Sequence, residues 1–293
     1  MTTPLAFLRQ DTPPYGVTQQ VAPLVRRITC RNPGPMTCDG TGTFIVGQGQ
    51  VAVIDPGPED EAHLAALLEA VRGETVTHIV VTHTHRDHSP LSRALKAATG
   101  APIVGCTPHR TPPAEGGEGA DQAHAPDQAM AEGDTITGPG WTLRAVETPG
   151  HTANHLCFAF PEGDMVFSGD MVMGWSTTVV SPPDGNMAAY CASLEKLRAR
   201  TERLFVPAHG PAIPSPAAWC VALLRHRLER EAEVLGALSA APAVIPDLVA
   251  QLYPAIDPRV RGAAGRSVLA HLEKLAAEGR ARREGEAWHR ASP

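Results

Sequence analysis

Residues 82–88 (THTHRDH) contain four side chains within six positions that can bind a metal ion. Imidazole and carboxylate groups are the ligands that zinc and related divalent ions accept. The segment continues the apolar run HIVVT (residues 78–82), which is typical of a buried strand. A loop leaving such a strand can direct all four side chains to one point, whereas a regular helix or strand would spread them over several faces. The sequence therefore predicts a metal site formed by His83, His85, Asp87 and His88.

Three further candidate ligands occur in matching contexts. His151 ends the sequence TPGH, Asp170 ends FSGD, and His209 lies in PAHG. Each is expected where an apolar strand gives way to a loop, and each has a glycine beside it, which lets the backbone approach a neighbouring group closely. A histidine after a turn is more often a surface residue than a ligand. These three residues are therefore interpreted as metal ligands only in combination with the first cluster.

The seven residues resemble the motif H-x-H-x-D-H…H…D…H of the metallo-β-lactamase superfamily, and the resemblance covers about residues 18–213. It implies an α/β fold, the αββα sandwich, with the metal ions at one edge. It also implies that His83, His85 and His151 bind one ion, that Asp87, His88 and His209 bind a second, and that Asp170 bridges the two. True β-lactamases of the superfamily lack this bridging aspartate, so the resemblance disfavours antibiotic hydrolysis.

The chemistry of the two ions agrees with this division. Dications ~3.5–4 Å apart repel each other, and a shared carboxylate with a shared hydroxide offsets the repulsion. Zinc lowers the pKa of bound water to about 7, so a bridging hydroxide is available as a nucleophile at neutral pH. We therefore expect a dinuclear metal-dependent hydrolase with two Zn²⁺ and with Asp87 and Asp170 among its catalytic residues. Iron or manganese would also fit these ligands.

Two residues near the ligands are candidates for supporting roles. Asp55 in VAVIDPG resembles the I-D-x-G turn of the superfamily, where the aspartate steadies a ligand through hydrogen bonds. The alternative is an ordinary turn residue before Pro56 and Gly57. His155, four residues after His151, is a candidate proton donor to a leaving group, or else a polar residue at the rim of the pocket.

The composition excludes several classes of protein. The net charge of −6 over 293 residues does not indicate a general nucleic-acid or membrane surface. No apolar run reaches the ~20 residues of a membrane span, and the first residues (MTTPLAFLRQDTPP) do not have the pattern of a signal peptide. Six scattered cysteines contain no C-x-x-C pair and are expected to be free thiols. We expect a cytoplasmic protein with no membrane partner.

The periodicity of apolar residues predicts strands that alternate with helices in the first 215 residues. Residues 107–133 are rich in Pro, Gly, Ala and acidic side chains and are expected to form a surface loop. The expected strands are residues 21–28, 43–46, 51–54, 78–82, 102–105, 141–147, 156–160, 165–167 and 204–206, and the expected helices are residues 59–71, 91–98 and 187–200.

From residue 216 onward, the sequence pattern predicts successive helices in place of alternating strands and helices. Helices are expected at about residues 217–240, 246–252 and 260–278, followed by a hairpin around Gly285. This is the order of a winged helix, so we expect two domains, a catalytic domain of residues 1–215 and a winged-helix-like domain of residues 216–293. The combination resembles the β-lactamase-like protein two branch, whose characterised members cleave single-stranded RNA. One departure is GTGTF (residues 40–44) where that branch has G-T-N-T-Y, which removes an amide and a phenol hydroxyl expected near the cleft.

A basic face is expected on the winged helix. Contact with the phosphates of nucleic acid is one interpretation of these cations, and a solvated surface or a homodimer contact is the alternative. Glutamates at positions 278, 284 and 286 dilute the positive charge. The candidate nucleic-acid-binding residues are Arg266, Lys274, Arg280, Arg282 and Arg283.

Three functions follow from these residues. The first is a phosphodiesterase or endoribonuclease that acts on single-stranded RNA held by the winged helix. The second is a hydrolase of small esters or thioesters, of the glyoxalase II or lactonase kind, because the same seven ligands serve those reactions. The third is a nucleic-acid-binding protein with a structural metal site, which the open coordination positions of this ligand set disfavour.

Overall fold

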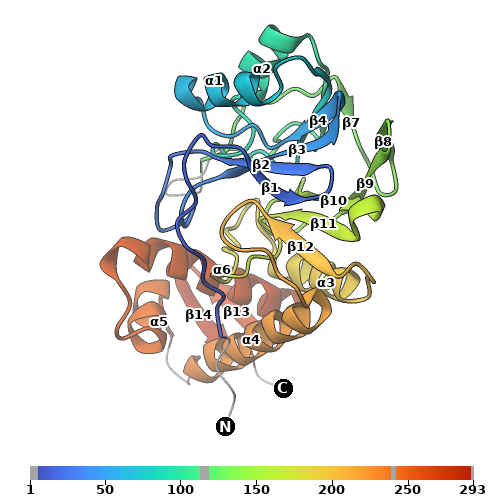
Figure 1. The fold of residues 1–293 in the computed structure, drawn as a ribbon. Coiled ribbons are helices and arrows are strands. Elements are labelled where there is room, and N and C mark those ends of the chain that lie inside the picture. Colours follow the sequence, from blue (N-terminus) through green and yellow to red (C-terminus); the bar gives the residue numbers. More distant parts are fainter. Residues whose placement is uncertain (1–5, 113–118, 239–241, 292–293) are drawn as a thin grey trace.

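The first half of the chain forms a seven-stranded mixed sheet (Figure 1). The computed structural model describes residues 6–112, 119–238 and 242–291. Strands β1 to β4 are antiparallel, and β4 to β7 are parallel. In sheet order, the strands are β1 (Gln19–Ala22), β2 (Val25–Thr29), β3 (Gly42–Gln48), β4 (Gln50–Ile54), β5 (Thr75–Val81), β6 (Ile103–Gly105) and β7 (Gln128–Ala129).

A second, five-stranded sheet packs against the first. Successive side chains of a strand point to opposite faces. Accordingly, Met165 and Phe167 lie in the core between the two sheets, whereas Val166 lies in a separate core under the helices on the other face. In sheet order, the strands are β12 (Leu204–Pro207), β11 (Met165–Gly169), β10 (Leu156–Phe160), β9 (Trp141–Glu147) and β8 (Thr135–Gly138). A 3-10 turn, η1 (Pro161–Gly163), joins β10 to β11.

Helices cover both outer faces of the two sheets (Figure 1). Helices α1 (Glu61–Ala70) and α2 (Ser92–Thr99) lie over the first sheet, and α3 (Met187–Arg198) and α4 (Pro216–Ala237) lie over the second. The side chains of Asp60 and Asn186 cap α1 and α3 by accepting hydrogen bonds from backbone amides of the first turn. The structure therefore confirms the αββα sandwich.

The C-terminal part of the chain has its own small core. It comprises α5 (Ile245–Leu252), η2 (Pro258–Val260), α6 (Arg261–Ala277) and the hairpin of β13 (Ala281–Glu284) and β14 (Ala287–Arg290), which confirms the winged helix. Helix α4 belongs to both parts, because Leu223 packs in the core under the second sheet and Val234 packs in the winged-helix core. The proposed domain boundary after residue 215 therefore falls at the start of a helix that the two cores share.

Several short elements differ from the expected ones. The expected strand at residues 21–28 is a hairpin, because the chain turns at Leu24 with a φ of 63°. The expected loop at residues 107–133 contains β7, and its residues 113–118 lie outside the described residues. The strand β8 was not expected, because Ile136 is the single apolar side chain among its four residues and gives no period. The first expected C-terminal helix, residues 217–240, ends as α4 at Ala237, and residues 239–240 lie outside the described residues.

All six cysteines are free. Across the described ranges, no helix combines the length and the apolar composition that a membrane span requires.

The Phe44 side chain is buried between the sheets and packs against Phe167 with ring centroids 5.2 Å apart. The expected place of this residue near the cleft is therefore wrong, because Phe44 lies in the core and does not line the cleft.

Candidate metal centre

All seven candidate ligands lie just beyond the carboxyl ends of strands at one edge of the sandwich. The first four follow β5, and His151, Asp170 and His209 follow β9, β11 and β12. Gly169, directly before Asp170, has a φ of 50°, and a Cβ at this position would lie 2.6 Å from His155 Nε2. A glycine is therefore required here for the backbone to bring Asp170 so close to its neighbours.

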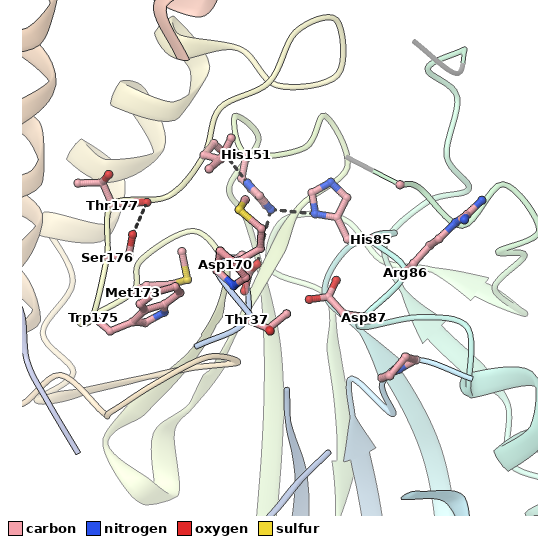
Figure 2. Close-up of a pocket in the computed structure, with 15 residues that line it drawn as sticks. Thr37, His85, Arg86, Asp87, His151, Asp170, Met173, Trp175, Ser176 and Thr177 are labelled. Atoms are coloured by element: carbon pink, nitrogen blue, oxygen red, sulfur yellow. Dashed lines mark hydrogen bonds and ion pairs between the residues drawn. The ribbon is translucent and has the colours of Figure 1, made fainter. Parts of the chain in front are cut away.

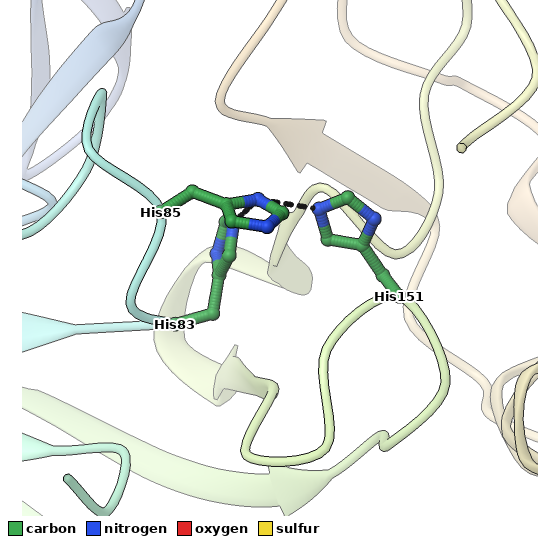
Figure 3. A group of neighbouring side chains, drawn as sticks. All are labelled: His83, His85 and His151. Carbon is green, nitrogen blue, oxygen red and sulfur yellow. Dashed lines mark hydrogen bonds between the residues drawn. The ribbon is translucent and has the colours of Figure 1, made fainter. Parts of the chain in front are cut away.

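Three imidazole rings meet in the first group of ligands (Figure 3). His85 Nδ1 lies 3.1 Å from His83 Nε2 and 3.0 Å from His151 Nε2. Burial and the neighbouring imidazoles lower the pKa of His83 well below its usual value and that of His85 to about 3. Neutral rings present lone pairs at these atoms, and three converging lone pairs form a binding site for a cation.

The second group contains Asp87, His88, Asp170 and His209. His209 Nε2 lies 3.2 Å from Asp87 Oδ2 and 3.4 Å from Asp170 Oδ1. His88 Nε2 lies 3.6 Å from both Asp87 Oδ2 and Asp170 Oδ2. Asp170 Oδ2 also lies 3.7 Å from His151 Nε2 of the first group. The carboxylate of Asp170 is thus placed between the two groups of ligands.

Charge in the second group is tightly balanced. Burial alone would lower the pKa of His209, but the carboxylates of Asp170 and Asp87 raise it to about 10, and the pKa of His88 is likewise raised well above its usual value. Burial alone would raise the pKa of Asp170, but His209 and His88 keep it well below its usual range. Without metal, two imidazolium ions therefore neutralise the carboxylates at neutral pH.

Buried polar atoms without hydrogen bonds show that these residues fit a metal ion. His88 Nε2, His209 Nε2 and Asp170 Oδ1 are buried and make the ion-pair contacts described above, but none of them forms a hydrogen bond among the described residues. Burying a polar group without a hydrogen bond destabilises a protein by about 1–3 kcal/mol. These atoms belong to groups of three candidate ligands, and the ligand atoms of each group lie within 4.8 Å of one another. Metal ions bound there would satisfy all of them.

The second ring nitrogen of the ligands is held by the protein. His151 Nδ1 donates to Val179 O at 2.7 Å, and His209 Nδ1 donates to Gly40 O at 3.2 Å. His88 Nδ1 donates to Asp55 Oδ2 at 3.0 Å. Such hydrogen bonds fix the orientation of each ring and leave Nε2 as the ligand atom.

Asp55 supports the site through hydrogen bonds to His88 and to Thr82. Its carboxylate also accepts hydrogen bonds from Thr82 N at 2.8 Å and Thr82 Oγ1 at 2.7 Å, directly before the first ligand loop. Asp55 is buried and has a φ of 48°, a conformation that aspartate and asparagine tolerate better than most residues. The structure thus places Asp55 where it ties the orientation of His88 to the end of β5.

The Asp55→Asn variant should bind metal about 10–100-fold more weakly, because asparagine keeps the shape and the backbone conformation but removes the negative charge that holds His88. Competition with a chromophoric chelator measures this affinity. Asp164→Asn is a matched control, since Asp164 also has a positive φ but lies in an exposed turn. Equal metal affinities in the two variants would contradict this role of Asp55.

The expected role of His155 as a proton donor is wrong. His155 is buried and both of its ring nitrogens are engaged with protein, because Nε2 accepts from Asp170 N at 3.2 Å and Nδ1 contacts Thr148 Oγ1 at 2.9 Å. No nitrogen of this ring is left for a leaving group. His155 instead positions the backbone of Asp170. It lies beside the candidate ligands without facing the metal site, so its spacing from His151 in the sequence could not distinguish it from them.

A largely apolar cleft of about 460 Å³ opens beside the metal centre (Figure 2). His85, Asp87, His151 and Asp170 form its polar wall on the side of the candidate ligands. The other polar residues of the lining are Thr37, Arg86, Ser176 and Thr177. Its other walls come from loops without a periodic pattern, so their residues were not predictable from the sequence. The apolar lining consists of Pro35, Met36, Pro58, Met173, Trp175 and Val179.

The expected basic face of the winged helix is largely neutralised. Lys274 forms ion pairs of 2.7 Å with Glu231 and 2.6 Å with Glu278, and Arg280 pairs with the same two carboxylates. Arg282 pairs with Glu284. Arg283 lies 5.8 Å from the ring centroid of Trp288 and donates to a backbone carbonyl, and Arg266 lies half-buried on α6. At least three of the five candidate cations therefore have carboxylate partners, and one of these partners, Glu231, comes from α4 and was not expected from the sequence.

The similarity to known proteins covers both parts of the chain. Residues 36–209 match the family model of the metallo-beta-lactamase superfamily, and residues 245–288 match that of the beta-lactamase associated winged helix domain. A protein of Pseudocercospora fijiensis named atrochrysone carboxyl ACP thioesterase is 30% identical over 93% of this chain and 80% of its own length. The beta-lactamase-like protein 2 homolog of Caenorhabditis elegans is 29% identical over 89% of this chain and 87% of its own length.

Solved structures agree with the fold. A beta-lactamase domain protein from Burkholderia ambifaria superposes with a TM-score of 0.81 at 22% identity, over 96% of this chain and 95% of that protein. A second structure, described as di-iron-bound, has a TM-score of 0.50 at 27% identity over 64% of this chain and 93% of that protein. The chain therefore belongs to the metallo-β-lactamase superfamily and is a metal-dependent hydrolase with a C-terminal winged-helix domain.

Proposed function

We propose that the protein hydrolyses thioesters or esters of apolar carboxylic acids. The observation that carries this proposal is the apolar cleft directly beside the candidate metal ligands, in which Met173 and Trp175 lie beside Asp170 (Figure 2). Met36 also lines this cleft. Such a cleft can bury an acyl chain and exclude water, while its polar wall faces the carbonyl group. The 30% identical relative is named a thioesterase, which supports the same reaction class.

The ligands would hold two divalent ions, one at His83, His85 and His151 and the other at Asp87, His88 and His209, with Asp170 between them. Metal ions in such a site supply Lewis-acid activation of water and of the scissile carbonyl group. Zinc suits this ligand set, and iron or manganese are also accepted by imidazole and carboxylate ligands. The di-iron-bound structure supports keeping iron among the candidates.

The chain's own residues set the rest of the mechanism. The hydrogen bonds from His151 to Val179 O and from His88 to Asp55 hold the rings in one orientation before substrate binds. Preorganised groups of this kind stabilise developing charge without having to rearrange during the reaction. The apolar side chains on the opposite wall would orient the acyl group, so that its carbonyl lies against the polar wall.

A side-by-side assay tests the proposal. Pantetheine thioesters of short and long acyl chains, the corresponding oxygen esters and a labelled single-stranded RNA are incubated with metal-loaded protein and with chelator-treated protein. We expect metal-dependent hydrolysis of the thioesters, with kcat/KM rising with acyl chain length. RNA cleavage without thioester hydrolysis would overturn the proposal in favour of the phosphodiesterase.

The cleft wall gives a separate prediction. Met36, which is 38% exposed at the rim, should bind a long acyl chain, so Met36→Glu should raise KM for a long-chain thioester by roughly tenfold, as expected for losing apolar contacts worth about 1.4 kcal/mol. KM for an acetyl thioester should change much less. Leu228→Glu is a matched control, because Leu228 is exposed on α4 and does not line the cleft. Similar KM values for the long chain in both variants would contradict this assignment.

Cleavage of single-stranded RNA is the second candidate, because the winged-helix domain is a module that binds nucleic acid in many proteins. The ion pairs of Lys274, Arg280 and Arg282 weigh against RNA cleavage, since cations neutralised by carboxylates attract phosphates less.

We also propose that the protein resides in the cytoplasm and that its winged helix is a surface for a homodimer.

A further inference from the structure

One segment without helix or strand, residues 171–180, lies between the metal centre and α4. On one side, Val179 O accepts the hydrogen bond from His151 Nδ1 at 2.7 Å, and Thr178 Oγ1 donates to Asp170 O at 2.7 Å. On the same side, Met173 and Trp175 line the cleft (Figure 2). The positions of two metal ligands and of one cleft wall therefore depend on this segment.

Helix α4 supplies side-chain donors to the other side of the segment. Trp219 Nε1 donates to Met173 O at 2.9 Å, and Arg227 Nη2, two turns further along the helix, donates to Thr178 O. A segment without ladder hydrogen bonds needs donors of this kind for its buried carbonyl groups. Both anchored carbonyls lie within eight residues of Asp170 along the chain.

Arg227 is an unusual residue for such a place. It is only 4% exposed, its guanidinium lies 5.1 Å from the ring centroid of Tyr190, and no carboxylate of the described residues forms an ion pair with it. A buried cation is unfavourable unless its surroundings compensate it, and here a backbone carbonyl and an aromatic face do so. An apolar side chain would fill the same space more easily, so the charge is explained by the carbonyl that it holds.

The winged helix holds α4 in turn. Glu231 lies one turn after Arg227, is 5% exposed, and forms ion pairs of 2.7 Å with Lys274 and 2.8 Å with Arg280. Helix α4 packs against α3 of the sandwich and against α5 and α6 of the winged helix (Figure 1). A continuous set of contacts thus leads from the winged helix through α4 to the ligands.

We propose that the winged-helix domain braces the metal centre. Arg227 and Trp219 are positioning residues that hold residues 171–180 in place, and through this segment they fix His151 and Asp170. Glu231 holds α4 against the winged helix through its ion pairs with Lys274 and Arg280. This role is independent of the substrate and goes beyond the proposed function, because it concerns metal binding by this chain.

Metal affinity of the full-length chain tests the brace. Arg227→Met keeps the volume of the side chain but removes the donor and the charge, and it should weaken zinc binding about 10–100-fold, as expected for residues that orient metal ligands. Arg227→Lys, which keeps a cationic donor, should recover part of the affinity. The affinities are measured by chelator competition, and the absorption spectrum of the cobalt-substituted protein reports the ligand geometry. Circular dichroism shows whether each variant is folded.

Arg225→Met is the matched control. Arg225 lies on the same helix with half of its side chain exposed, and should bind zinc within about twofold of the original chain. Glu231→Gln tests the ion pairs of Glu231, and should weaken zinc binding in the same direction as Arg227→Met but less. Folded Arg227→Met with unchanged zinc affinity and an unchanged cobalt spectrum would overturn the brace.

Two further results decide the remaining cases. Unchanged zinc affinity in Glu231→Gln would show that the winged helix plays no part in the brace and would overturn that half of the proposal. If Arg227→Met does not fold, Trp219→Phe takes its place, because phenylalanine keeps an aromatic ring and loses only the N–H donor. Zinc affinity in Trp219→Phe equal to that of the original chain would then overturn the proposal, whereas weaker binding would support it.

Discussion

Replacing Asp170 with asparagine is expected to lower hydrolysis at least roughly 10³-fold, because the carboxylate that lies between both groups of ligands loses its charge. Asp170 Oδ1 and Oδ2 lie 3.4 to 3.7 Å from the ring nitrogens of His209, His88 and His151. Without the negative charge, two dications would repel each other with less compensation. Elemental analysis should therefore find fewer than two metal ions per chain, and circular dichroism should find the fold preserved.

Asp121→Asn serves as a control for the loss of a buried carboxylate. Asp121 is buried like Asp170, but it pairs with Arg93 and accepts a hydrogen bond from Ser89, away from the ligand atoms. This variant should lose some stability and keep its metal content. An Asp170→Asn protein with two full equivalents of metal and normal turnover would remove Asp170 from the site.

The convergence of the seven candidate ligands could be predicted from the sequence because it depends on local features. Four ligands lie in one short segment, and each of the others stands beside a glycine at the end of an apolar strand, so a motif preserves their geometry. The sandwich could be predicted for a similar reason, since alternation along strands such as β11 separates one core from the other. In both cases the information lies within a few neighbouring residues.

The supporting contacts could not be predicted because they join segments far apart in the chain. His155 follows His151 at a helical spacing, but only the fold shows that its ring lies against the amide of Asp170. The sequence suggested that Lys274 and Arg280 could contact phosphates. In the fold, Glu231 of α4 forms ion pairs with both of them. Arg227 carries no motif, and its partner carbonyl at Thr178 is 49 residues away. Pairings of this kind depend on tertiary packing, which periodicity does not encode.

Removal of the metal ions is expected to abolish hydrolysis and to lower Tm by on the order of 10 °C. A ligand present at about a thousandfold its Kd stabilises the folded state by about 4 kcal/mol, and 1 kcal/mol shifts Tm by about 2–4 °C in chains of about 150–250 residues. The metal-free protein should stay folded, because its cores do not include the metal centre. Thermal unfolding with and without a chelator measures the shift, and Asp170→Asn should show a smaller one.

The pH dependence of metal binding follows from the protons that the ions must displace. In the metal-free protein the pKa of His209 is raised to about 10, so its ion pairs contribute full stability below its ordinary value of 6.5 and lose it as the pH rises through about 10. The pKa of Asp170 is lowered, so its contribution is present above its ordinary value of 3.8 and is lost only as the pH falls through the lower folded-state value. At neutral pH both groups are charged, and a metal ion can bind the second group only after His88 and His209 release their protons.

The ion at the second group should therefore bind more weakly as the pH falls from 8 to 6, by about tenfold per pH unit for each displaced proton. The pKa values of His83 and His85 are lowered instead, so these two ligands hold no protons to displace in that range. The ion at the first group should therefore bind with a weaker dependence on pH than the ion at the second. Chelator competition at several pH values, resolved into two binding steps, distinguishes the two ions. Two steps with the same pH dependence would contradict the charge distribution in this site, because they would mean that the imidazoles of the two groups start from the same protonation state.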